Sequence, residues 1–127
     1  MVVKIKSMGV VMNLENYKIK PRSEFVSTSL QSYVTASYAE LVKVFGEPQC
    51  TETSGDGKVD IEWELTIEDY DHNITRPLTI YNWKDYDGGF EARSNPTYNW
   101  HIGGTSGIVG AYVKEYIENT LNFMEAV

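Results

Sequence analysis

Cysteine is almost missing from this chain, with Cys50 alone among 127 residues. One cysteine excludes an internal disulfide and any metal site built from several thiolates. A chain without disulfides suits a reducing compartment, and we expect a cytoplasmic protein. The first residues lack the long apolar run of a signal peptide or membrane span. No motif completes a ligand set, so we expect neither a metal nor a cofactor.

Basic residues are also few. Lysine and arginine number 11 against 18 acidic residues, which gives a net charge of −7 and a pI near 4.7. A protein that follows a nucleic-acid backbone needs a basic stripe, and the sequence has none. We therefore expect no nucleic-acid partner. An acidic surface keeps a protein soluble, and it can also dock on a basic partner.

Hydrophobic patterning predicts an N-terminal arm or strand over residues 1–26 and a single α+β domain over residues 27–127. Residues 58–67 alternate strictly between apolar and polar side chains, as a half-buried antiparallel strand does. Ser37 and Glu40 form a capping box that begins a helix, which ends at Gly46. A long apolar stripe after Thr105 or Ser106 predicts a C-terminal helix.

These elements predict an antiparallel sheet of about four strands with two helices packed on one face, in the order strand, helix, three strands, helix. The remaining strands are expected near residues 27–34, 77–83 and 98–102. Residues 13–26 and 69–75 read as connections. Residues 85–96 read as a long loop with a hairpin at Asp87–Gly89.

Residues 100–107 read Trp-His-Ile-Gly-Gly-Thr-Ser-Gly, which favours a strand end, a two-glycine turn and a helix start. Such a junction points backbone N–H groups and the positive end of a helix dipole at one place. A phosphate could bind at the N–H groups of residues 104–107. The same residues would also serve as an ordinary capped turn, and both interpretations stay open.

Around this junction the sequence supplies the other parts of a nucleotide site. Aromatic side chains could stack a base, cations could neutralise a phosphate, and a histidine could add a hydrogen bond. The predicted ligand-binding residues are Gly103, Gly104, Thr105, Ser106, His101, Trp83, Lys84, Trp100, Tyr81 and Arg93, with Trp63 as a further aromatic.

A second candidate surface is acidic. Asp60, Glu62 and Glu64 fall on the polar face of the strand over residues 58–67. They could form a plain solvated face, or dock on a basic host protein. His101 could act as a general acid or base in phosphodiester hydrolysis. No catalytic constellation can be assembled from the spacing, so we expect a non-catalytic protein, with a phosphodiesterase as the alternative.

Several segments together resemble a family of small, mostly uncharacterised proteins of tailed bacteriophages. They are TSLQSY at 28–33, SYAELV at 37–42 with FGEP at 45–48, GDGKV at 55–59 with EW at 62–63, IYNWK at 80–84, and WHIGG at 100–104. The resemblance covers about residues 27–118.

This resemblance implies a phage protein that acts against host defences in the cytoplasm of the infected bacterium. Two modes of action fit the sequence. One is a sponge that binds a phosphate-bearing nucleotide immune signal without cleaving it. The other is an anti-CRISPR-like inhibitor that docks on a host defence protein through Asp60, Glu62 and Glu64. We expect no membrane partner, and a homodimer would help to close a small-ligand pocket.

Overall fold

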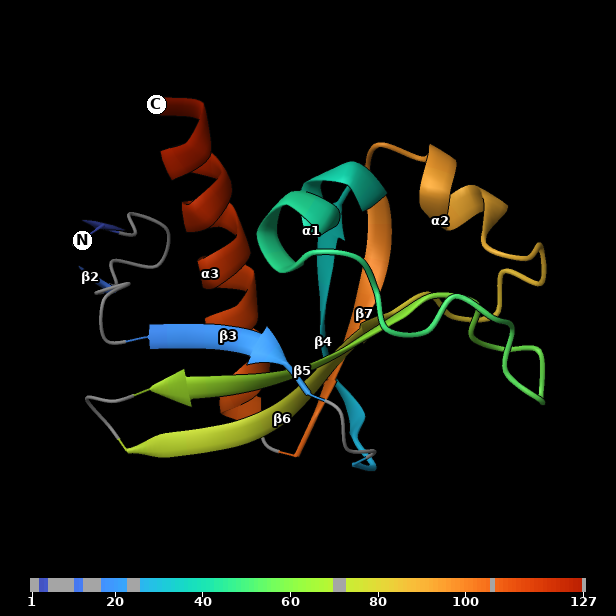
Figure 1. Cartoon of the computed structure of the whole chain (residues 1–127), viewed down its shortest axis with the longest axis horizontal. Coiled ribbons are helices and arrows are strands. Elements are labelled where there is room, and N and C mark those ends of the chain that lie inside the picture. The colour runs from blue at the N-terminus through green and yellow to red at the C-terminus, as the bar shows by residue number, and fades with distance from the viewer. Residues whose placement is uncertain are drawn as a thin grey trace.

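The computed structural model describes residues 3–4, 11–12, 17–22, 26–69, 73–105 and 107–126. Within these residues the fold is α+β, as predicted (Figure 1). A five-stranded antiparallel sheet has the spatial order β3–β5–β6–β7–β4, and β1 and β2 pair separately. The strands are β1 (Val3–Lys4), β2 (Val11–Met12), β3 (Tyr17–Pro21), β4 (Ser29–Ala36), β5 (Glu62–Asp69), β6 (Ile74–Tyr81) and β7 (Tyr98–Gly104); the helices are α1 (Tyr38–Phe45), α2 (Phe90–Ser94) and α3 (Gly107–Ala126).

Helices α1 and α3 share one hydrophobic core with one face of the sheet (Figure 1). Leu41 and Phe45 of α1 and Val113 and Ile117 of α3 are buried there against side chains of β5, β6 and β7. Both long helices therefore pack on the same face, as the sequence predicts. The opposite face of the sheet carries the polar and aromatic side chains considered below.

Helix α1 begins and ends where the sequence predicts. The Ser37 hydroxyl accepts a hydrogen bond from the Glu40 backbone at 3.0 Å, and the Glu40 carboxylate accepts one from the Ser37 backbone at 2.9 Å. These two bonds complete a capping box. At the other end Gly46 has φ of +81° and donates its N–H to the Val42 carbonyl at 2.8 Å.

Strand β3 corrects the expectation of a loop or arm over residues 13–26. It pairs antiparallel with β5, with Ile19 opposite Ile67 and Lys20 opposite Glu68. Lys20 and Glu68 form a salt bridge. Tyr17-Lys18-Ile19-Lys20 does alternate, but the run is short and ends at Pro21, and lysines are typical of an edge strand.

One connection is shorter than expected. Strand β5 runs on to Asp69 and β6 begins at Ile74, so Asp69, Ile74 and Thr75 of the expected connection at 69–75 are strand residues. Pro77 lies within β6, where that strand pairs with β5 and not yet with β7. The ladder with β7 begins only at Leu78, so the missing N–H of Pro77 removes no hydrogen bond from that ladder.

The expected loop at 85–96 contains a helix and not a hairpin. The Asp87 carboxylate accepts hydrogen bonds from the backbone N–H groups of Gly89 and Glu91, both at 2.9 Å. These bonds satisfy N–H groups at the start of α2. The glycines at 88 and 89 have φ of +67° and +91°, and they bring the chain into this helix.

The structure also corrects the two-glycine turn. Gly103 and Gly104 are residues of β7, which lies between β4 and β6. Gly103 pairs with Leu30 on one side and Thr79 on the other. A Cβ at this position would lie 2.7 Å from the Thr28 hydroxyl and closer still to that of Thr79. The two hydroxyls are hydrogen-bonded at 2.9 Å, so the glycine makes room for their contact.

Substituting Gly103 tests this packing role. Gly103→Ala should lower the free energy of unfolding by about 1–3 kcal/mol, because the added methyl overpacks a central strand. Gly55→Ala is the matched control, since a Cβ at Gly55 meets nothing within 4 Å. Urea unfolding of both variants measures the difference. Equal stabilities would contradict the tight packing over Gly103.

Candidate functional site

A row of side chains crosses the open face of the sheet from β4 to β5. Tyr33 of β4 pairs with His101 of β7, His101 pairs with Tyr81 of β6, and Tyr81 pairs with Glu62 of β5. The Tyr33 and His101 rings are 4.9 Å apart between centroids, and the Tyr81 and His101 rings 5.4 Å. Cross-strand partners on one face lie side by side, so three rings form a surface that ends at a carboxylate.

A groove of about 630 Å³ lies over this row. Its size is within the range of small-molecule sites, roughly 300–1,000 Å³. Aromatic, acidic and hydroxyl-bearing side chains from four segments of the chain line it. The lining residues are Val26, Ser27, Thr28, Leu30, Asp56, Val59, Glu62, Glu64, Thr79, Tyr81, Trp83 and His101.

Trp83 forms the wall at the end of β6. Its ring centroid is 6.0 Å from that of Tyr81 and 6.1 Å from that of His101. The ammonium groups of Lys58 and Lys84 lie 5.8 and 5.6 Å from the Trp83 ring centroid. The Lys84 backbone N–H donates to the Lys58 carbonyl at 2.8 Å, which ties the two segments together. Two positive charges therefore lie at this wall.

A buried hydrogen-bond network holds the segment that carries Trp83 and Lys84. The Asn82 amide donates to Asp60 at 2.9 Å and to Asp85 at 3.1 Å. Its oxygen accepts from the backbone N–H groups of Asp60 and Ile61 at 2.7 and 3.0 Å. The Tyr98 hydroxyl also donates to Asp85. Every polar atom of the Asn82 side chain is thus satisfied, which fixes this turn.

The same network corrects the place of Asp60. The sequence predicts it on an acidic face with Glu62 and Glu64, but its side chain is only 2% exposed. It accepts hydrogen bonds from Thr53 at 2.7 Å and from Asn82. Strand β5 begins at Glu62, so the alternation does not extend back to Asp60. Of the three predicted carboxylates, Glu62 and Glu64 line the groove.

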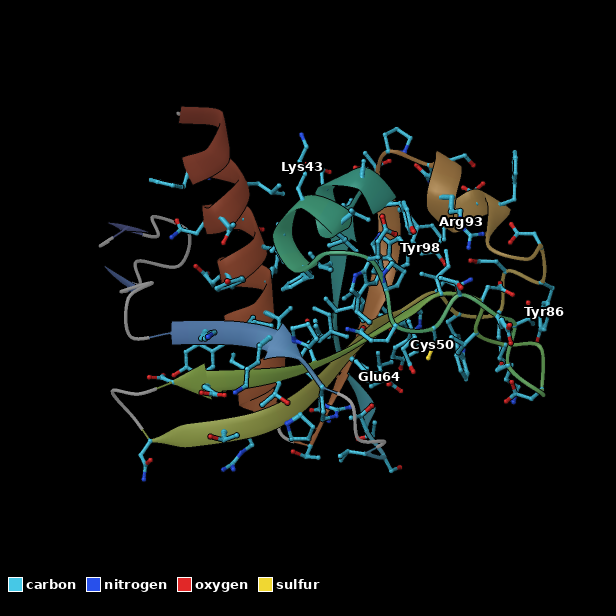
Figure 2. All side chains as sticks on the ribbon, viewed as in Figure 1. Lys43, Cys50, Glu64, Tyr86, Arg93 and Tyr98 are labelled. Atoms are coloured by element: carbon cyan, nitrogen blue, oxygen red, sulfur yellow. The ribbon has the colours of Figure 1, made fainter. Side chains whose placement is uncertain are left out.

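The thiol of Cys50 lies close to these two carboxylates. The Cys50 and Glu62 backbones exchange two hydrogen bonds, of 3.0 and 2.9 Å, in an isolated bridge. The thiol sulfur and one oxygen each of Glu62 and Glu64 lie within 4.8 Å of one another. Figure 2 shows Cys50 and Glu64 near the start of β5. One sulfur and two oxygen atoms are ligands that a divalent transition metal could accept. Sequence spacing gave no sign of this group, because Cys50 is separated from Glu62 by a turn-rich loop.

Burial and mutual repulsion shift the titration of this group. Desolvation, together with the neighbouring charge of Glu64 and a hydrogen bond to it, raises the pKa of Glu62 to about 7; Arg22 opposes the shift. Desolvation and the charges of Glu64 and Glu62 raise the pKa of Cys50. At neutral pH the thiol is therefore protonated, and Glu62 exchanges between its two forms.

His101 has the opposite shift. Desolvation lowers its pKa, against a smaller opposing effect of Asp85. Its Nδ1 atom is buried and has no hydrogen-bond partner among the residues described. The imidazole is therefore neutral at pH 7 and presents an aromatic surface between two tyrosines. Desolvation, then the charge of Glu62, raises the pKa of Tyr81, which keeps its hydroxyl protonated.

The structure brings together four of the predicted ligand-binding residues. Tyr81, Trp83 and His101 line the groove, and Lys84 lies over Trp83. Gly103 lies beneath the Thr28 and Thr79 hydroxyls that also line it. The sequence missed Tyr33, Thr28 and Thr79. Tyr33 alternates with the buried Val34, and a β-bulge between Leu30 and Ser32 obscures which face it takes.

Other predicted residues lie elsewhere. Trp100 is fully buried on the covered face, where its indole N–H donates to the Ala36 carbonyl, so it cannot stack a ligand. Trp63 is buried beside it. Arg93 lies on α2 (Figure 2), over the Tyr38 ring, and donates to the Gly88 carbonyl. Tyr38 packs on Trp63, which places Arg93 on the helix-covered side.

The structure removes Gly104 from the predicted anion site at residues 104–107. Gly104 pairs with Ser29 and Leu78 inside the sheet, so its backbone is not a free turn. Thr105 is exposed and follows β7, and α3 begins at Gly107. Ser106 lies outside the residues that the structure describes. The groove over β6 and β7 therefore replaces the glycine junction as the candidate site.

Comparisons with protein-family models, curated proteins and solved structures gave no match. In the described part of the chain, no helix has both the length and the apolar character to cross a membrane.

The raised pKa of Glu62 predicts a pH-dependent stability. The folded protein keeps the Glu62 proton up to about pH 7, whereas the unfolded chain releases it near 4.5. Between these values the folded state binds more protons, so the free energy of unfolding falls as pH rises. Glu62→Gln cannot titrate and should be more stable than wild type at pH 8, by about 1–2 kcal/mol after allowance for partial exposure.

Urea unfolding at pH 5, 6, 7 and 8 checks this difference. The comparison of wild type with Glu62→Gln cancels the titration of His101, which both proteins share. Glu52→Gln removes the same charge from an exposed loop position and should track wild type at every pH. A stability difference between Glu62→Gln and wild type that does not change from pH 5 to 8 would show that Glu62 titrates normally.

Proposed function

We propose that this chain is a non-catalytic binding protein that sequesters a phosphate-bearing nucleotide. The observation that carries the proposal is the groove over three neighbouring rings, Tyr81, His101 and Trp83. Every nucleobase has a π-face, and stacking on aromatic side chains contributes about 1–3 kcal/mol per base. A neutral His101 and a protonated Tyr81 can both serve as stacking partners.

Lys58 and Lys84 support a phosphate at the Trp83 end of this groove. Their ammonium groups lie 5.8 and 5.6 Å from the ring centroid of Trp83, which lines the groove. Glu62 and Glu64 line the opposite end of the groove, whereas one carboxylate, that of Asp56, lies beside Lys58, so a phosphate would be repelled more strongly from the Glu62 end. The charges therefore favour one orientation, with the base over Tyr81 and His101 and the phosphate at the two lysines.

The resemblance to phage proteins supports a role in counter-defence. Four of the segments that carry it supply residues of the groove: Thr28 and Leu30, Val59 and Glu62, Tyr81 and Trp83, and His101. We therefore propose that the ligand is a nucleotide immune signal in the cytoplasm of an infected bacterium. We also propose a homodimer that closes the groove, in which Leu30 and Tyr33, both 45% exposed, would contact the second copy.

Native mass spectrometry of the protein, incubated with an extract of defence-active bacteria, tests this proposal. We expect a mass increment of a few hundred daltons that denaturation releases as an intact nucleotide. Tyr81→Ala should lose the increment, and Tyr86→Ala should keep it, because Tyr86 is 65% exposed and lies outside the groove lining (Figure 2). A cleaved product would support the phosphodiesterase alternative, and an unliganded mass would contradict binding.

The acidic end of the groove supports a second candidate function, docking on a basic host defence protein. Glu62 and Glu64 lie close to Tyr81, and Tyr33 and Trp83 are partly exposed nearby. Tyrosine and tryptophan beside carboxylates are typical of binding hot spots for arginine and lysine side chains. Glu62 and Glu64 would then be the recognition residues.

Charge reversal distinguishes this second candidate. A pull-down from bacterial extract should retain a basic partner at low salt and lose it at high salt, since exposed charges are screened. The double variant Glu62→Lys/Glu64→Lys should abolish retention, and Glu47→Lys/Glu52→Lys, at exposed positions outside the groove, should not. Retention by both variants would exclude the acidic groove as the docking surface.

A further inference from the structure

The polar groups at the β5 end of the groove include two carboxylates. Glu62 and Glu64 are carboxylates, which accept hydrogen bonds when ionised. No lysine, arginine, asparagine or glutamine is among the described residues that line the groove. The remaining polar lining groups are mainly hydroxyls, which can either donate or accept. A ligand edge that meets Glu62 and Glu64 must therefore present donors.

The register fixes where that edge would lie. Glu62 is the cross-strand partner of Tyr81, and Glu64 is the partner of Thr79, one row along the same face. A planar ring stacked over Tyr81 and His101 would have Glu62 one strand spacing away, roughly 5 Å, in the plane of the sheet. A base in this position would direct one edge at the two carboxylates.

The nucleobases differ in what such an edge offers. Guanine has two adjacent donors, the ring N1–H and the exocyclic amino group, which match the two oxygens of one carboxylate. Adenine and cytosine place an amino donor beside a ring acceptor. Uracil and thymine place their ring N–H between two carbonyl oxygens. An acceptor of either kind would face the negative charge of Glu62 or Glu64.

We propose that the groove selects a guanine base, whose N1–H and amino group donate to the Glu62 carboxylate beside Glu64. The inference rests on the proposed nucleotide-binding function and adds the identity of the base to it. The spacing of the two carboxylates supports it, because oxygen atoms of Glu62 and Glu64 lie within 4.8 Å of one another and donors could reach both. Charge-assisted hydrogen bonds of this kind are stronger than neutral ones.

Titration calorimetry with GMP, IMP and AMP tests the inference. IMP differs from GMP only because its base lacks the exocyclic amino group. Loss of one hydrogen bond to a charged group costs roughly tenfold or more in affinity, so GMP should bind about tenfold tighter than IMP and tighter still than AMP. Glu62→Gln should reduce this preference, because an amide offers one acceptor and one donor. Glu52→Gln should leave it unchanged.

The outcomes separate the base preference from nucleotide binding itself. Equal affinity for GMP and AMP would overturn guanine selection and leave the proposed function standing. A preference for GMP that survives in both Glu62→Gln and Glu64→Gln would also overturn it. If none of the three nucleotides binds at millimolar concentration to the folded wild-type protein, the inference and the proposed function both fail. Circular dichroism of each variant establishes that it is folded.

Discussion

The contact between Trp63 and Trp100 decides how the rest of the sheet is oriented. Their rings meet edge to face at 5.3 Å, and both are fully buried under the helices. Each indole N–H reaches a backbone carbonyl, Gly46 for Trp63 and Ala36 for Trp100. Because side chains alternate along a strand, burial of these two tryptophans turns Glu62, Glu64 and His101 to the opposite face.

The row of aromatic rings on the open face follows from the register of the sheet. Once the register places His101 between Tyr33 and Tyr81, three rings become neighbours without any special loop. The loop contribution is Trp83, held by the Asn82 network at the end of β6. Lys84 adopts φ of +57° in this turn, a backbone conformation that an L-residue takes only when its surroundings fix it.

Alternation and capping made much of this fold predictable. They predicted a strand over residues 58–67, most of which lies in β5, together with the first helix with both of its ends and the long C-terminal helix. The glycine pair was misread because glycine serves tight turns and close packing alike, and the Thr28–Thr79 contact is long-range. The groove itself depends on which strands are neighbours, and local patterns do not contain that pairing. Asp60 was misplaced because β5 begins only at Glu62, and Trp100 because its side chain is buried on the helix-covered face.

The acidity of the chain is compatible with a small anionic ligand because salt limits the distance over which the net charge acts. A net charge of −7 acts over distances near the Debye length of about 8–10 Å and repels long nucleic-acid backbones. A mononucleotide carries far less charge than a nucleic-acid polymer, and within the proposed site it would meet Lys58 and Lys84 at short range. The same composition that disfavours a polymer thus permits a small nucleotide.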